Sequence, residues 1–453
     1  MPGKEKPLRI ALVHPDLGIG GAERLVVDAA VGLQSRGHSI DVLTSHHDPS
    51  HCFEETRDGT LNVSVLGDWL PRQIMGKGHI LFAILRGVVL ALSMLLPTSP
   101  AYDVIVVDQL SASIPILRFT NAKILFYCHF PDKLLTKRES FLKKLYRIPV
   151  DLLEEATTKA ADEIVVNSKF TARIFKGSFP SIKRVPQVLY PCIHLPSYSE
   201  KVDMSSPLVS LLASNKKTIL SINRFERKKN IELAVLAFSE LLEKKNIEND
   251  AVRLVVAGGY DPRVEENKEY LRELESLAAS LGLNSFVAFA GCDSIPGTTQ
   301  VLFLPSFNVE QRTYLLANST CLLYTPSNEH FGIVPVESMY AGLPVIAVNS
   351  GGPMETIIDG KTGFLLQPEP AAFADAIYDL ISGRGKAKEL GQAGKKRVEE
   401  TFTSVVFIDA LEAIIRSTVS GKNPEASMAW YLCLSVGAWV ILVAVAVAYH
   451  VLI

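Results

Sequence analysis

The chain has 453 residues, a formal net charge of -2, and 48% hydrophobic and 21% charged residues. This length is sufficient for two ordinary hydrophobic cores and exceeds that of a typical single domain. A nearly neutral chain has no overall basic footprint, so the composition argues against nucleic acid as a partner.

The first half alternates short apolar runs with helical patterns. Strands that are buried on both faces of a parallel sheet have this pattern, because helices cover both sides of the sheet. We therefore predict a doubly wound, Rossmann-like domain over residues 1–195. Its predicted strands lie at 8–13, 40–44, 104–107, 124–127 and 163–166.

A glycine-rich turn follows the first predicted strand and opens a helix. It reads Gly18-Ile19-Gly20-Gly21-Ala22-Glu23. Glycines let backbone amides approach a diphosphate closely, so Gly20 and Gly21 are candidates for phosphate binding. Glu23 stands where the dinucleotide fingerprint G-x-G-x-x-G requires glycine, and a dehydrogenase therefore loses its main support.

An apolar run at 80–96 resembles a membrane span. If it crossed a bilayer, the strands at 8–13 and 104–107 would lie on opposite sides of the membrane and could not share a sheet. We therefore predict a helix of the first domain. Two alternatives stay open: a plain core helix, or a helix that also has one face on the membrane surface.

Residues 134–147 have a basic amphipathic pattern. Such a helix suits anionic lipid or a phosphate-bearing acceptor, and a solvated helix face is the alternative. The predicted acceptor or membrane contacts are Lys137, Arg138, Lys143 and Lys144.

His129 follows the strand predicted at 124–127 directly. A lone histidine is more often structural than catalytic. Ligands of doubly wound sheets bind beyond the carboxyl ends of the strands, however, and this position makes His129 a candidate for the active site.

The second half repeats the α/β pattern. A Ser-, Pro- and Lys-rich linker is predicted at 196–217, a second Rossmann-like domain at 218–400, and a helix returning to the first domain at 401–420. Two such sheets facing each other would leave a ligand-binding cleft. The predicted strands of this half lie at 218–222, 253–257, 286–289, 321–323 and 344–348.

Cations follow the first strand of the second domain. Arg224 offers a planar fork and Lys229 a compact charge, and both suit a nucleotide diphosphate. A solvated charged turn is the alternative.

Glu329 and Glu337 lie eight residues apart around the predicted start of a helix near Phe331 and Gly332. The free amides at that start, including that of Ile333, would face an anion. The sequence contains no Asp-x-Asp pair, the common metal clamp of nucleotide-sugar enzymes. We therefore predict no metal in the site. Cationic side chains and backbone amides would instead stabilise the negative charge of the leaving group.

A membrane helix is predicted at 428–450. The segment from 428 to 453 has no Asp, Glu, Lys or Arg, and about 20 apolar residues cross a bilayer. Arg416 and Lys422 precede it and no cation follows, so the globular part should face the cytosol. The six cysteines include no C-x-x-C pair and no secretory signal precedes the first strand, which fits a reducing compartment.

Several of these motifs together resemble the retaining glycosyltransferases of family 4, which have the two-domain GT-B fold. They are the run Gly20-Gly21-Ala22-Glu23, the cations Arg224 and Lys229, and the carboxylates Glu329 and Glu337. The resemblance extends from Leu8 to about residue 420. Within the family, the runs at 128–132 and 223–230 resemble mannosyltransferases that extend the dolichol-linked core of asparagine-linked glycosylation.

The resemblance implies GDP-mannose as donor, no cofactor, and dolichyl-diphosphate-linked Man1GlcNAc2 as acceptor. The acceptor would gain an α1,3 and then an α1,6 mannose at the cytosolic face of the endoplasmic reticulum membrane. Other early dolichol-pathway mannosyltransferases are further candidate partners. The competing hypotheses are a family 4 enzyme with another lipid acceptor and a non-catalytic scaffold.

The resemblance also implies residue roles. It places Glu329 at the mannose hydroxyls, Glu337 at the ribose, and His129 beside the transferred sugar. Arg224 and Lys229 would bind the diphosphate. The implied catalytic group is His129, Glu329, Lys229 and Arg224, and the implied donor contacts are Gly20, Gly21, Arg224, Lys229, Glu329, Phe331, Gly332, Ile333 and Glu337.

Overall fold

The computed structural model describes residues 6–74, 78–136, 141–193, 203–245, 247–248, 250–383 and 386–421. The chain forms two compact units: unit 1 is Met1–Pro191 with Ser404–Ile453, and unit 2 is Cys192–Thr403. The membrane helix predicted at 428–450 lies outside the described residues, as do Lys137 and Arg138. Within the described ranges, no helix has both the length and the apolar character needed to cross a bilayer.

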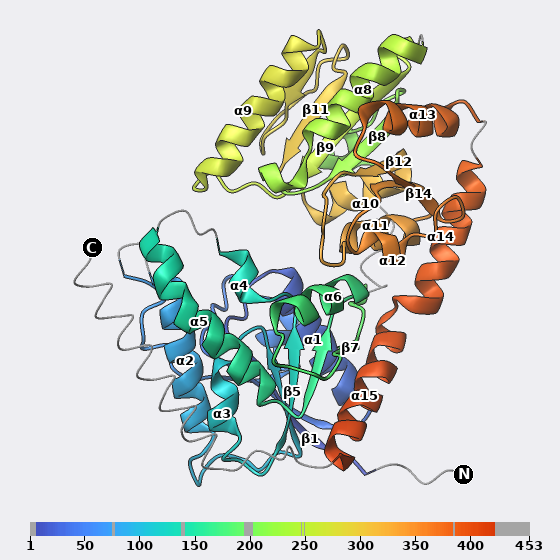
Figure 1. The fold of residues 1–453 in the computed structure, drawn as a ribbon. Coiled ribbons are helices and arrows are strands. Elements are labelled where there is room, and N and C mark those ends of the chain that lie inside the picture. Colours follow the sequence, from blue (N-terminus) through green and yellow to red (C-terminus); the bar gives the residue numbers. More distant parts are fainter. Residues whose placement is uncertain are drawn as a thin grey trace, which may run out of the picture. The chain divides into compact units, whose positions relative to one another are not determined.

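Unit 1 contains a parallel sheet with the strand order β3-β2-β1-β4-β5-β6-β7 (Figure 1). The order changes direction between β1 and β4, so the carboxyl ends of these two strands mark the topological switch point. The strands are β1 (Arg9–His14), β2 (Ser39–Thr44), β3 (Asn62–Val65), β4 (Val104–Asp108), β5 (Lys123–Cys128), β6 (Glu163–Val166) and β7 (Gln187–Val188).

Helices cover both faces of this sheet, and β1 shows why its apolar run is continuous. Ala11 and Val13 pack with α2 on one face, whereas Leu12 lies with α1 and α15 on the other. The helical elements are α1 (Gly21–Ser35), η1 (Glu54–Thr56), α2 (His79–Ser93), η2 (Ser111–Ser113), α3 (Ile114–Leu117), α4 (Asp132–Leu135), α5 (Phe141–Lys159), α6 (Lys169–Ser178) and α15 (Ser404–Ser420).

The region predicted as one amphipathic helix at 134–147 is divided. Helix α4 ends at Leu135, Thr136 is extended, and α5 begins at Phe141. The Glu154 carboxylate accepts the backbone N–H groups of Asp132 and Lys133 and so caps the start of α4 separately. The segment is therefore not one continuous helix, and the lipid or acceptor contacts expected along it stay a prediction. Of its basic residues, Lys144 is exposed on α5.

Unit 2 contains a second parallel sheet with the order β10-β11-β9-β8-β12-β13-β14 (Figure 1). Its switch point lies between β8 and β12. The strands are β8 (Lys217–Ile222), β9 (Val252–Gly258), β10 (Ser285–Val287), β11 (Val301–Pro305), β12 (Ser319–Tyr324), β13 (Val345–Val348) and β14 (Gly363–Leu366).

The helices α8, α9 and α13 pack over one face of this sheet, with Phe238, Tyr270 and Phe373 in the core. Helix α10 contacts β8, and α11 packs on α14. The helical elements are α7 (Pro207–Ser210), η4 (Arg227–Lys229), α8 (Glu232–Lys245), α9 (Glu265–Ser280), α10 (Val309–Asn318), α11 (Ile333–Tyr340), α12 (Pro353–Thr356), α13 (Pro370–Ile381) and α14 (Ala387–Thr401).

The predicted linker differs from the structure in its second half. Val209 and Leu212 are completely buried, and the Arg253 guanidinium donates to the Leu212 carbonyl. Residues 203–217 therefore form a packed part of unit 2, which begins at Cys192. The helix predicted to return to the first domain is α15, whose Ile408 fills the space above Gly32 of α1.

Candidate active site

Lys229 and Glu329 lie at the switch point of unit 2. Lys229 ends the short turn η4 after β8, and the Thr325 hydroxyl, just after β12, donates to its carbonyl over 2.8 Å. The Lys229 ammonium donates to Glu329 Oε2 over 2.5 Å. Asn230 follows in the left-handed region with φ 48°, a conformation that asparagine tolerates better than most residues. The chain therefore turns sharply just after delivering Lys229.

Two donors hold the Glu329 carboxylate. Besides Lys229, the Tyr324 hydroxyl at the end of β12 donates to it. Burial raises the pKa of Glu329, but the charge and hydrogen bond of Lys229 outweigh burial and lower it. Burial, together with the Glu329 carboxylate, raises the pKa of Tyr324 well above its ordinary value. At neutral pH, Glu329 is thus an ionised acceptor and Tyr324 a neutral donor.

Two glycines fix the loop that carries Glu329. A Cβ at Gly351, which has φ 66°, would overlap the backbone of Glu329, and one at Gly352 would overlap that of Phe331. The Gly352 N–H donates to the Glu329 carbonyl over 2.7 Å. The Phe331 ring packs against Phe402 with centroids 5.8 Å apart, so its side chain belongs to the core of unit 2.

Helix α11 begins at Ile333, one residue after the sequence-based start. Gly332 caps it with φ 84°, where a side chain would be strained and would press on the Tyr324 ring. The first amides of a helix lack partners inside it and favour an anion. One turn later, Glu337 is buried and accepts from Arg312 of α10 over 3.2 Å.

Arg224 differs from Lys229 in its environment. Its side chain is 63% exposed and pairs with Glu226 at 3.2 Å, whereas that of Lys229 is 12% exposed. The structure therefore brings Lys229, Glu329 and the start of α11 together, with Arg224 on the same strand end in solvent contact. A cation, a carboxylate and free amides suit a diphosphate and sugar hydroxyls.

Unit 1 carries a second group of polar residues at its own switch point. His14 ends β1, Asp108 ends β4, and His129 follows β5. One oxygen of Asp108 lies 2.7 Å from His14 Nδ1, and the other lies 2.8 Å from His129 Nε2. Asn167, just after β6, donates to the His129 carbonyl over 3.1 Å and fixes its backbone.

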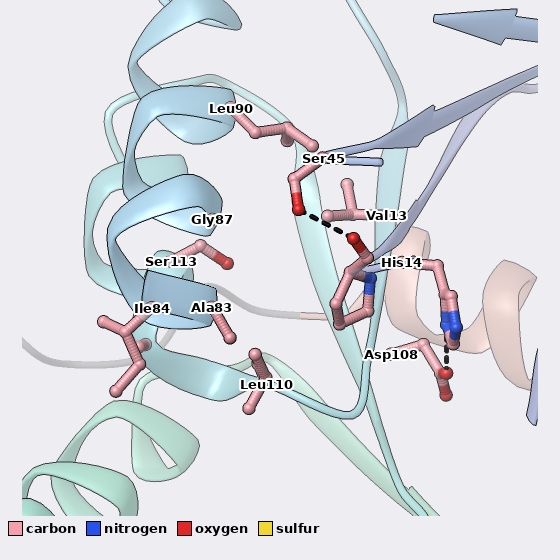
Figure 2. A pocket seen from close by; sticks show the side chains of 12 residues that line it. Val13, His14, Ser45, Ala83, Ile84, Gly87, Leu90, Asp108, Leu110 and Ser113 are labelled. Carbon is pink, nitrogen blue, oxygen red and sulfur yellow. Dashed lines mark hydrogen bonds and ion pairs between the residues drawn. The ribbon is translucent and has the colours of Figure 1, made fainter. Parts of the chain in front are cut away.

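Figure 2 shows His14 pointing to Asp108 at one edge of a pocket. Helix α2 supplies the opposite wall with Ile84, Gly87 and Leu90, so most of the lining is apolar. The apolar surroundings strengthen the interaction between the two charged groups, because water screens them little.

His14 and Asp108 have strongly shifted pKa values. Burial lowers the pKa of His14, but hydrogen bonds to Asp108 and Glu23 and their charges together raise it to about 9. Burial raises the pKa of Asp108, but His129 and His14 together lower it to about 2. At neutral pH, His14 is therefore protonated and Asp108 ionised. Neither residue was predicted from the sequence, and neither was Tyr324. Each is the polar or aromatic residue that ends an apolar strand.

The glycine loop leads into α1, which begins at Gly21. A Cβ at Gly20 would collide with the Glu23 carboxylate, which also lies 3.9 Å from His14 Nε2. In the described part of the chain, no group of three or more His, Cys, Asp and Glu residues is placed to hold a metal ion.

Comparison with known proteins places the chain in a family. Two family models match it: "Glycosyltransferase Family 4" over residues 19–195 and "Glycosyl transferases group 1" over 207–397. Among solved structures, a sucrose-phosphate synthase from Thermosynechococcus elongatus shares the fold, with 21% identity, a TM-score of 0.69, and coverage of 90% of this chain and 98% of the other. The glycosyltransferase from Rickettsia africae is similar, with 18% identity, a TM-score of 0.68, and coverage of 92% and 100%.

Curated relatives are much closer in sequence. The α-1,3/1,6-mannosyltransferase ALG2 of Rhizomucor pusillus is 54% identical, over 95% of this chain and 97% of the relative. The human protein of the same name is 48% identical, over 89% and 94% of the two chains. The chain therefore belongs to the α-1,3/1,6-mannosyltransferases named ALG2, within glycosyltransferase family 4.

Proposed function

We propose that the protein transfers mannose from GDP-mannose to dolichyl-diphosphate-linked Man1GlcNAc2, first in α1,3 and then in α1,6 linkage, giving Man3GlcNAc2. The observation that carries this proposal is the sequence similarity to α-1,3/1,6-mannosyltransferases over nearly the full chain. One of them is 54% identical. An intact set of donor-binding residue types in unit 2 supports an active enzyme rather than a scaffold, because a scaffold has no need to keep a charged pair at a switch point.

Unit 2 is suited to the donor. Lys229 and the first amides of α11 neutralise the diphosphate, and Arg224 adds a charge from the solvent side. Glu329 accepts hydrogen bonds from mannose hydroxyls and Glu337 from the ribose. In the structure, Lys229 pairs with Glu329. Donor binding would break this ion pair, and each of the two residues would contact the donor instead.

The bond that breaks joins the anomeric carbon of mannose to the diphosphate. Negative charge grows on the leaving phosphate, and Lys229 stabilises it more in the transition state than in the ground state. We propose attack from the same face, with the departing phosphate accepting the proton of the acceptor hydroxyl. No divalent metal is needed for this charge balance. A covalent mannosyl adduct trapped on any side chain would contradict same-face attack.

We further propose that the protein works at the endoplasmic reticulum membrane with both units in the cytosol. The uncharged stretch from 428 to 453 supports a membrane anchor, and the cations before it support this orientation. Lys144 on α5 and the exposed Leu134 and Leu135 on α4 are candidates for contact with lipid or the acceptor diphosphate. Other enzymes of the early pathway are candidate partners at the same membrane.

A donor panel tests the proposed function. The purified full chain is incubated with a short-chain lipid diphosphate carrying Man1GlcNAc2 and with labelled GDP-mannose or UDP-glucose, each with and without EDTA. We expect transfer from GDP-mannose alone and no effect of EDTA. Transfer only from UDP-glucose, no transfer at all, or loss of transfer in EDTA would each contradict part of the proposal.

A further inference from the structure

Four charged or titratable side chains form a line through unit 1. They come from α1, the end of β1, the end of β4 and the residue after β5. In spatial order they are Glu23, His14, Asp108 and His129. Both ends of the line reach a predicted ligand-binding element: Glu23 covers Gly20 of the glycine loop, and His129 is the candidate sugar contact.

Exposure changes along this line. The side chains of His14 and Asp108 are 1% and 4% exposed, whereas that of His129 is 23% exposed. The Glu23 side chain is 22% exposed. A ligand can therefore reach both ends of the line, and the two groups between them are closed off from solvent. Their charges, one positive and one negative, compensate each other in the interior.

The geometry also defines which ring nitrogens carry hydrogen. An ionised carboxylate only accepts, so both nitrogens that face Asp108 must donate. His129 therefore carries its hydrogen on Nε2, which lies 2.8 Å from Asp108 Oδ1. In the neutral imidazole, Nδ1 is then an acceptor.

We propose that Asp108 is a positioning residue: it fixes His129 in the Nε2–H form, so that Nδ1 accepts a hydrogen bond from a hydroxyl of the transferred mannose or of the acceptor. His14 supports this role, because its hydrogen bond to the second carboxylate oxygen leaves Asp108 one orientation and opposes protonation of Asp108. Glu23 ends the line and links it to the glycine loop. The proposal rests on the function proposed above only where it names the hydroxyl.

Asp108→Asn is the direct test. The amide keeps the size of the side chain but can donate to His129 Nε2, which favours the other ring form and removes the acceptor. We expect kcat for mannose transfer to fall about 100-fold or more, as wrong ring forms cost in other enzymes, while KM for GDP-mannose stays within about three-fold. An unchanged kcat would overturn the proposal.

A double variant separates positioning from a structural role. If Asp108 acts through His129, adding Asp108→Asn to His129→Ala should cost no more than about two-fold beyond His129→Ala alone. A full additional loss would overturn the proposal, because it would show an effect of Asp108 independent of His129. The matched control is Asp41→Asn, which changes another buried carboxylate of the same sheet and should keep kcat within about two-fold.

A spectroscopic measurement covers the case in which Asp108→Asn does not fold. Full-length protein labelled with ¹⁵N-histidine is recorded near pH 8, and the signals of His129 are identified by their loss in His129→Ala. We expect the pattern of an imidazole with hydrogen on Nε2. A pattern with hydrogen on Nδ1 would overturn the proposal. This result does not depend on turnover, so failure of the proposed function and failure of this inference can be told apart.

Discussion

The two units place charged groups at equivalent points of two similar sheets but use them differently. In unit 2, Lys229 and Glu329, the proposed donor contacts, are partly exposed and form an ion pair with each other. In unit 1, the pair His14 and Asp108 is closed to solvent, whereas the neighbouring His129 is partly open. We propose that a bound donor breaks the ion pair in unit 2, whereas the pair in unit 1 stays in place and orients His129. In unit 2, loss of a charged residue should therefore weaken neutralisation of the donor diphosphate. In unit 1, it should change the orientation of the His129 ring or lower stability.

The largest effect expected from this comparison is that of Lys229→Ala. It removes the cation that we propose stabilises the leaving diphosphate, and it leaves Glu329 without its ion pair. We expect kcat/KM for GDP-mannose to fall about 1,000-fold or more, with an unchanged circular dichroism spectrum. Lys228→Ala is the matched control, since Lys228 is 67% exposed and pairs with Glu226 instead. Equal losses in both variants would show that general charge matters rather than position.

Glu329→Gln and Glu337→Gln sharpen the division within unit 2. Glu329→Gln removes the negative charge beside Lys229 while keeping hydrogen-bonding capacity, and we expect transfer to fall about 100-fold. Glu337→Gln lies at the predicted ribose contact, so it should raise Kd for GDP about 10-fold and change kcat little. Titration calorimetry with GDP and initial rates at saturating donor distinguish the two. The reverse pattern would exchange the two assigned roles.

The pH dependence of stability should differ between the units. The pKa of His14 is raised to about 9, so its stabilising effect is complete below its unfolded value of 6.5 and is lost as pH rises through 9. The pKa values of Asp108 and Glu329 are lowered, so their effects are present above their ordinary values and lost in acid. Alkaline loss of stability should therefore be confined to unit 1, at about 3 kcal/mol between pH 6.5 and 9.

Hydrogen exchange of the full chain, read peptide by peptide from pH 6 to pH 9, tests this difference. Peptides of β1 and β4 should lose protection at high pH more than those of β8 and β12. His14→Gln should lower protection in β1 at pH 6 and abolish most of its alkaline change. Parallel loss in both sheets would contradict the assignment of the charge to His14.

The smallest expected effect concerns the turn after Lys229. Asn230→Ala places a residue with a Cβ and no local hydrogen-bonding group in the left-handed region, so we expect a loss of about 1 kcal/mol in the free energy of unfolding. Asn230→Gly fits this backbone and should be neutral within about 0.5 kcal/mol. Denaturant unfolding measures both. A stable Asn230→Ala variant would show that the turn does not depend on this conformation.

The strongest elements of both sheets were predictable because their apolar runs are continuous. Strands β1, β4, β8 and β9 lie where the sequence predicted them. Strands β3, β7 and β14 were missed, since they are short and partly exposed and thus lack such a run. Strand β11 was also missed, although its run Val301–Pro305 is continuous and fully buried. The strand predicted at 286–289 ends at Val287.

The site was predictable where a motif is local and not where it depends on strand order. Glu329 and Gly332 stand in one short segment, and Lys229 follows a clear strand. His14 and Asp108 are 94 residues apart and meet because β1 and β4 are neighbours in the sheet. Nothing in the spacing reveals this pairing. Facing domains, the metal-free site and the residue roles stay predictions.

The most direct test of the account follows product linkage over time. Wild-type protein and Lys229→Ala are incubated with GDP-mannose and the Man1GlcNAc2 lipid, and products are assigned by linkage-specific mannosidases and mass. We predict that an α1,3-linked mannose appears first and an α1,6-linked mannose second. Lys229→Ala should lose both, because we propose that a single donor site serves both transfers. A variant that loses only one linkage, or a wild type that forms only one, would contradict this account.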